Sequence, residues 1–249
     1  MTNYDKVKIV VVGDSGVGKT SAVHLICFNK PLSSPSWTVG VSLEVKLHDY
    51  KAGTPQQKPY FIELWDIGGS SSHRNSRSTF FNGVNGVILV HDLGNRKSEA
   101  NLRKWLKEIF TSKEKDNNHG LGGGGGTSSS HSYMGGDDDD FDPEQFVGST
   151  QIPVFVIGTK QDSLSDGNRL PVHSRASVIA EECGAEEIFM NCLDVKSLSP
   201  GSTAAVKICR FFDKVVERRF HREQQQFNSF YDRRKIYPQS TKSYGDDFF

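Results

Sequence analysis

The stretch that decides the fold is Gly13-Asp14-Ser15-Gly16-Val17-Gly18-Lys19-Thr20. Residues 7–12 before it form a nearly continuous β-branched run, which is typical of a strand buried on both faces of a sheet. Residues 19–28, which include the end of the stretch, have the pattern of a helix. The pattern G-x-x-x-x-G-K-[ST] between a buried strand and a helix predicts a loop that binds nucleotide phosphates.

Each residue type in this loop suits a phosphate. The glycines let the backbone approach phosphate oxygens, and the N–H groups at the start of the following helix favour negative charge. The Lys19 ammonium reaches the terminal phosphates, and the Thr20 hydroxyl is a ligand for Mg²⁺. The predicted phosphate contacts are Asp14, Ser15, Gly16, Val17, Gly18, Lys19, Thr20 and Ser21.

The choice of base is predicted from Gly158-Thr159-Lys160-Gln161-Asp162, which follows a second buried strand at 153–157. The Asp162 carboxylate can accept hydrogen bonds from N1–H and the 2-amino group of guanine, and adenine lacks both donors. The Lys160 stem can pack over the base, with Thr159 beside it. The nucleotide is therefore expected to be GTP or GDP, and a P-loop ATPase or kinase is the alternative that Asp162 argues against.

Three further residues are expected at the same site. Thr38 is a second candidate ligand on the Mg²⁺ side, and Asp66 ends a strand where its carboxylate can hold a metal-bound water. The N–H of Gly69 can meet a γ-phosphate. Each of these signals is weak alone, and only their order behind the phosphate loop assigns them to one site.

The remaining pattern predicts an α/β fold of the P-loop NTPase type. Strands that alternate with helices imply a mostly parallel sheet with helices on both faces. Residues 41–50 and 58–66 alternate apolar and polar side chains around a turn, so a hairpin supplies one antiparallel edge strand. Further strands are expected at 84–90 and 187–190, and helices at 98–110, 172–183 and 203–220.

The domain is expected to span residues 1–222. Residues 113–150 contain runs of Gly, Ser and Asp that bury too little apolar surface to fold, so they are interpreted as a disordered loop that interrupts the domain. Residues 223–249 are interpreted as a polar, disordered tail.

Composition excludes several classes of function. Thirty basic and thirty acidic residues cancel among 249, so no global charge favours nucleic acid or a membrane. Four widely spaced cysteines indicate reduced thiols in a cytoplasmic protein. The sequence has no signal-peptide pattern and no apolar run of the roughly 20 residues that a membrane span needs.

These elements, in this order, resemble the Ras superfamily of small GTPases, and the Rab branch most closely. Finer features resemble the Rab-like protein 3 family: Pro35-Ser36-Trp37-Thr38-Val39-Gly40, Glu63-Leu64-Trp65-Asp66-Ile67-Gly68-Gly69 and Val90-His91-Asp92-Leu93. The resemblance spans most of residues 5–221. It implies a GTP/GDP-dependent switch with Mg²⁺, in which Asn191 and Cys192 occupy the stretch that closes over the base.

The departures from the family pattern concern catalysis and nucleotide retention. Ser70 stands where most small GTPases have the Gln that orients the attacking water, so slow intrinsic hydrolysis is expected and no residue is assigned as catalytic. Pro31 replaces an aromatic residue against the guanine, Thr159 replaces the usual Asn, and Asn191-Cys192-Leu193 replaces a Ser-Ala-Lys stretch. All three changes remove contacts to the nucleoside, so fast exchange is expected.

The resemblance also bears on partners. It implies effector and exchange-factor proteins and is compatible with a homodimer. The last cysteine is Cys209, inside a predicted helix, so no prenyl anchor is expected and membrane contact would be indirect, through a partner. The alternative is an interaction protein, or scaffold, in which the bound nucleotide is mainly structural.

Overall fold

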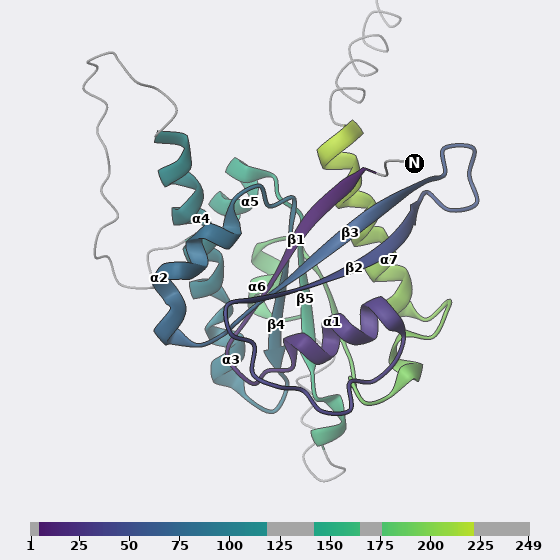
Figure 1. Ribbon diagram of the computed structural model, residues 1–249, viewed down its shortest axis with the longest axis horizontal. Coiled ribbons are helices and arrows are strands. Elements are labelled where there is room, and N and C mark those ends of the chain that lie inside the picture. The colour runs from purple at the N-terminus through teal and green to yellow at the C-terminus, as the bar shows by residue number, and fades with distance from the viewer. Residues whose placement is uncertain (1–4, 119–141, 165–175, 222–249) are drawn as a thin grey trace, which may run out of the picture.

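The computed structural model describes residues 5–118, 142–164 and 176–221. The fold is built on a six-stranded sheet with the strand order β2-β3-β1-β4-β5-β6 (Figure 1). All neighbouring pairs are parallel except β2 with β3, which form an antiparallel hairpin. The predicted α/β class with one antiparallel edge strand is therefore confirmed. The strands are β1 (Lys6–Val12), β2 (Val41–Tyr50), β3 (Lys58–Ile67), β4 (Gly86–Asp92), β5 (Val154–Thr159) and β6 (Glu186–Phe189).

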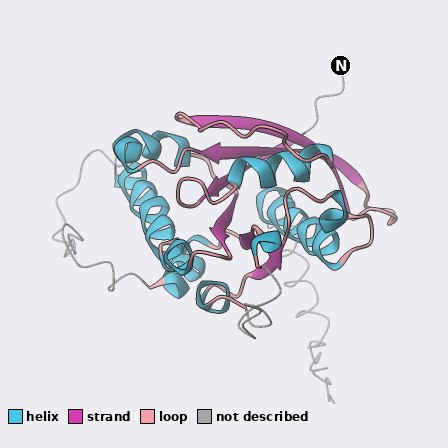
Figure 2. Ribbon diagram, turned by 90° about the horizontal axis from the view of Figure 1, so that it is seen from below, coloured by secondary structure: helices cyan, strands magenta, loops and turns pink. Residues whose placement is uncertain are grey.

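Helices cover both faces of the sheet (Figure 2). One apolar core joins the sheet to α1 (Lys19–Phe28) and α7 (Thr203–Val216). A second core, on the other face, joins it to α4 (Leu102–Asn118), α5 (Pro143–Thr150) and α6 (Val178–Glu182). The central strands supply alternate side chains to the two cores, and this explains why β1, β4 and β5 are continuous apolar runs.

The segment 113–150 is more ordered at its ends than its composition predicts. Helix α4 continues to Asn118, and α5 occupies Pro143–Thr150. Helix α5 forms because the Asp142 side chain caps the N–H of Glu144, Pro143 suits the first helical turn, and Phe146 is fully buried in the core. The expected disordered loop is thus too wide at both ends, and residues 119–141 lie outside the described part of the chain.

Other boundaries differ by a few residues. The helix predicted at 98–110 is divided into α3 (Arg96–Ala100) and α4. Helix α6 begins at Val178, and most of the earlier part of that predicted helix lies outside the described residues. A one-turn π-helix, Glu217–His221, follows α7.

The order of the strands locates the site. After β1 the chain forms β2 and β3 on one side of β1, and after β3 it crosses to β4 on the other side, so β1 lies at the topological switch point of the sheet. Ligands of open α/β sheets bind at the carboxyl ends of the strands at such a point. The loop after β1, the end of β3 and the end of β5 meet there. Among the described residues, no helix is long and apolar enough to cross a membrane.

Candidate functional site

The loop 13–18 has a backbone that only glycine allows at key positions. Gly16 and Gly18 have φ angles of 76° and 96°, in the left-handed region. A Cβ on Gly13 would lie 2.1 Å from the carbonyl oxygen of Val90. The loop therefore folds tightly against β4, and α1 begins directly after it at Lys19.

The Lys19 side chain closes over this loop. Its Nζ donates hydrogen bonds to the carbonyl oxygens of Gly13, at 2.9 Å, and Asp14, at 2.8 Å. Burial lowers the pKa of Lys19, the negative charges of Asp66 and Asp14 raise it, and the Arg77 guanidinium lowers it further. The ammonium is thus buried at the loop beside two carboxylates.

The predicted Mg²⁺ ligands are brought together. The Thr20 and Thr38 hydroxyls both donate to Asp66 Oδ2, at 2.5 and 3.1 Å, and lie 3.1 Å from each other. Asp66 Oδ1 is buried without a hydrogen-bond partner among the described residues, and burial raises the pKa of this carboxyl group.

The donor set at this point fits a hard cation. Two hydroxyls and a carboxylate are oxygen ligands of the kind that Mg²⁺ accepts together with phosphate oxygens and water. Within the described ranges, no cluster of three or more His, Cys, Asp or Glu side chains offers a separate metal site.

Gly68 and Gly69 pack between the phosphate loop and the segment around Thr38. A Cβ on Gly69 would lie 2.5 Å from the Ser15 nitrogen, and a Cβ on Gly68 would lie 2.6 Å from the Thr38 carbonyl oxygen. The Gly68 N–H also donates to the Gly40 carbonyl oxygen at 2.8 Å. Three segments far apart in the sequence are therefore in direct backbone contact.

Thr159 joins the phosphate loop to the sheet. Its side chain is 0% exposed, and its hydroxyl lies within hydrogen-bond reach of the carbonyl oxygens of Val17 and, at 2.9 Å, His91. A hydroxyl carries one proton, so two carbonyl groups share one donor. Lys160 follows in the left-handed region, and its Nζ forms an ion pair with Asp92 Oδ2 at 2.8 Å.

The segment around Asp162 lies beside the loop 190–194. Asp162 is exposed in a 3₁₀ turn, and the neighbouring Gln161 N–H points to the Met190 carbonyl oxygen at 3.4 Å. Burial raises the pKa of Cys192 to about 12, and the negative charge of Asp162 contributes to that rise. The Asn191 side chain accepts a hydrogen bond from the Leu193 N–H at 2.8 Å, so it stabilises its own turn.

Ser70 directly follows Gly68 and Gly69, and its side chain contacts another side chain of the same loop. Its Oγ lies 2.7 Å from the Ser72 Oγ, in an exposed loop. The side chain has neither the reach nor the amide of a Gln at this position.

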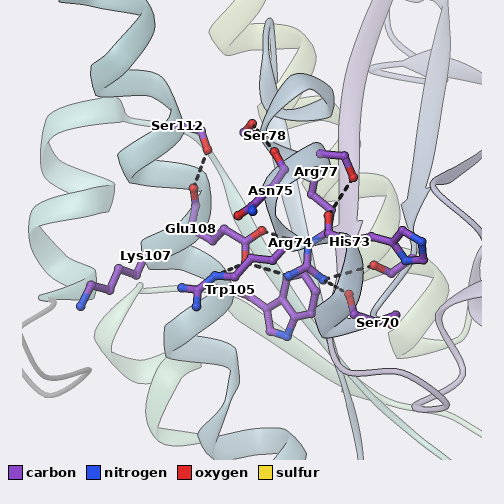
Figure 3. A network of polar contacts seen from close by, with 12 residues as sticks. Ser70, His73, Arg74, Asn75, Arg77, Ser78, Trp105, Lys107, Glu108 and Ser112 are labelled. Atoms are coloured by element: carbon purple, nitrogen blue, oxygen red, sulfur yellow. Dashed lines mark hydrogen bonds and ion pairs between the residues drawn. The ribbon is translucent and has the colours of Figure 1, made fainter. Parts of the chain in front are cut away.

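The sequence did not predict the polar contacts behind the loop, and Figure 3 shows those around Arg77 and Trp105. The Asp14 carboxylate accepts hydrogen bonds from Asn101 Nδ2 at 2.7 Å and Trp105 Nε1 at 3.0 Å. Trp105 also lies under the Arg77 guanidinium, at 4.3 Å from carbon to ring centroid. The spacing of Trp105 with apolar residues indicated only a core position, and no local signal marked Arg77.

Comparisons with known proteins place the chain among small GTPases. Residues 8–119 match the family model described as Ras of Complex, Roc, domain of DAPkinase. The chain is 46% identical to human Rab-like protein 3 over 98% of both chains, and 45% identical to the mouse Rab-like protein 3 over 95% of both. It is also 40% identical to the Arabidopsis thaliana small GTPase LIP1, over 42% of this chain and 33% of that protein.

Proposed function

The chain belongs to the Rab-like protein 3 family of Ras-type small GTPases, and from this premise we propose a switch that holds GTP or GDP with Mg²⁺, hydrolyses GTP slowly and exchanges nucleotide quickly. The observation that carries the proposal is the convergence of Thr20, Thr38 and Asp66 beside Lys19 at the carboxyl ends of the strands.

The phosphate end of the nucleotide is assigned to the loop 13–20. Lys19 is buried there as a cation, and a phosphate anion beside Nζ would offset the cost of that burial. Asp66 Oδ1 has no hydrogen-bond partner among the residues that the structure describes, and this supports a metal-bound water at this point, with the Thr20 and Thr38 hydroxyls as direct ligands. A bound Mg²⁺ would neutralise charge on the phosphates.

The base is assigned to the loops that contain Asp162 and Asn191. Asp162 is exposed, so its carboxylate is accessible to a guanine base, and this supports the assignment. The ion pair with Asp92 fixes the end of the Lys160 side chain, so that its stem can lie over the base.

Slow hydrolysis is proposed from Ser70. Positioning a water for attack on the γ-phosphate requires a polar group that reaches past the loop. The Ser70 hydroxyl instead lies beside Ser72. The chain then hydrolyses GTP with only the electrostatic stabilisation that Lys19 and the metal site supply, unless a partner contributes a further group.

Fast exchange is proposed from the base side. The only side-chain proton of Thr159 is engaged by carbonyl groups of the protein, so Thr159 cannot also donate to the nucleotide. An Asn has two amide protons and an acceptor oxygen, which would serve both purposes. Pro31 supplies no aromatic ring to stack on the guanine.

The output of the switch is proposed to be partner binding. Trp37 and Val39 flank Thr38 and are 84% and 77% exposed, so ordering of Thr38 by a γ-phosphate and metal would reposition two large apolar side chains. We assign effector and exchange-factor proteins to this surface. A second copy of the chain is the other candidate partner, and it is tested by measuring the molar mass in both nucleotide states.

The proposal is tested by nucleotide competition and single-turnover hydrolysis on the purified protein. GTP and GDP should displace a fluorescent GDP analogue, and ATP should not. Hydrolysis of bound GTP should be slower than in a Rab protein that carries the Gln. Equal competition by ATP would remove the guanine assignment. Equal capture, by the GDP and GTP-analogue forms, of a partner that contacts the Trp37 and Val39 surface would favour a scaffold in which the nucleotide is structural.

A further inference from the structure

Arg77 is a buried cation in the segment 68–81, which we call the switch II segment. Its guanidinium is 4% exposed and forms a two-point ion pair with Glu108 on α4, with Nε–Oε1 and Nη2–Oε2 distances of 2.9 and 3.0 Å. The remaining Nη1 donates to the carbonyl oxygens of Ser70, at 3.1 Å, and Gly68, at 3.3 Å (Figure 3). All three guanidinium nitrogens are therefore engaged.

The partners of Arg77 are themselves tied to the phosphate loop. Glu108 and Trp105 lie on α4, the Arg77 guanidinium lies over the Trp105 ring, and Trp105 Nε1 donates to the Asp14 carboxylate. A continuous path of contacts thus runs from Asp14 through α4 to the carbonyl groups that flank Gly69.

This arrangement differs in kind from ordering by a ligand. In a GTP-dependent switch, the γ-phosphate and Mg²⁺ order such a segment, and hydrolysis releases it. Two-point pairs of Arg with a carboxylate are strong and geometrically specific, and breaking a buried pair leaves an uncompensated charge. The hydrogen bonds from Arg77 to the Gly68 and Ser70 carbonyl groups do not depend on a phosphate.

We propose that Arg77 is a positioning residue that holds the switch II segment against the phosphate loop in both the GDP and the GTP state. The inference rests on the proposed function, because it concerns the two nucleotide states of that site. The response to GTP then lies mainly in the segment around Thr38, for which the described part of the chain shows no ion pair or hydrogen bond to α4. Partners that contact only the switch II segment then bind both the GDP and the GTP state.

Hydrogen exchange followed by mass spectrometry tests this inference on the full chain loaded with GDP or with a non-hydrolysable GTP analogue. In the natural protein, peptides covering 68–81 should be similarly protected in the two states. Arg77→Met should make these amides exchange at least about tenfold faster in the GDP state, because a hydrogen-bonded, charge-paired anchor is lost. The GTP analogue should restore much of that protection in the variant.

The matched control is Arg74→Met. Arg74 also approaches Glu108, but at 3.7 Å from Nε to Oε2 and with a side chain that is 63% exposed, so its loss should leave exchange unchanged. A second variant, Arg77→Met with Glu108→Gln, avoids a buried unpaired carboxylate and should still loosen the segment in the GDP state only. If Arg77→Met does not fold, as judged by exchange of the β1 and β4 amides, this double variant decides the matter.

Two results would overturn the inference. One is a natural protein whose switch II segment is much less protected with GDP than with the analogue. The other is a variant that loosens the segment equally in both states, which indicates a general structural role. If neither GDP nor the analogue binds the purified protein at saturating concentration with Mg²⁺ present, the proposed function fails. The inference then fails too unless Arg77→Met loosens the segment in the nucleotide-free protein.

Discussion

Replacing Thr159 with Val removes one buried hydroxyl and keeps the shape of the side chain. The Val17 and His91 carbonyl groups then lose the donor they share. An unsatisfied buried polar group costs about 1–3 kcal/mol, and the lower half of that range applies here because one proton served both acceptors. Val17 lies in the phosphate loop, so most of the cost should fall on the nucleotide complex. A loss of about 1–2 kcal/mol corresponds to GDP release that is faster by roughly 5- to 30-fold.

The assay is displacement of a fluorescent GDP analogue by excess GDP with Mg²⁺ present. The control is Thr150→Val, which removes a hydroxyl that bonds the Phe146 carbonyl oxygen at the end of α5, outside the nucleotide site. Its release rate should equal that of the natural protein. If Thr159→Val released nucleotide within about twofold of the natural rate, the shared hydroxyl would not support the phosphate loop, and the predicted link between Thr159 and nucleotide retention would be wrong.

Three other predictions concern hydrolysis, metal and thiols. Ser70→Gln should raise single-turnover GTP hydrolysis at least about tenfold, because the amide can orient water; an unchanged rate would mean that another part of the site is limiting. Asp66→Asn should weaken Mg²⁺ affinity by about 10- to 100-fold. A chelator should therefore accelerate GDP release in the natural protein but hardly in the variant. Equal acceleration in both proteins would contradict the metal site. Iodoacetamide at pH 8 should modify exposed Cys209 before Cys192, whose thiol stays protonated because burial raises its pKa to about 12; peptide mass spectrometry that finds Cys192 first would show that the loop 190–194 opens readily.

The elements nearest the phosphate loop could be predicted from the sequence because their signals are local. Buried β-branched runs mark β1 and β5, and the glycine pattern fixes where α1 begins, at Lys19. The parallel pairing of β1 with β3 brings Thr20, which follows β1, close to Asp66 near the end of β3. Thr38, in the segment before β2, contacts the same carboxylate. Their roles in binding remain predictions that the measurements above address.

The features that could not be predicted depend on partners distant in the sequence. Arg77 and Glu108 are 31 positions apart, and each alone resembles an ordinary surface charge. Asp14 looked like a backbone contact only, because nothing in the sequence indicates that Asn101 and Trp105 satisfy its carboxylate. Helix α5 was not predicted because the Gly, Ser and Asp runs before it indicated disorder. The signals for the helix, a cap at Asp142 and one buried Phe146, are short and weak in comparison.

The lifetime of GDP on the purified natural protein tests the central claim most directly. The loop 13–20 and Asp162 predict that a fluorescent GDP analogue binds in the presence of Mg²⁺. The limited contacts from Thr159 and Pro31 predict that it leaves within minutes after excess GDP is added. An analogue that stays bound for hours, or one that never binds, would contradict the account.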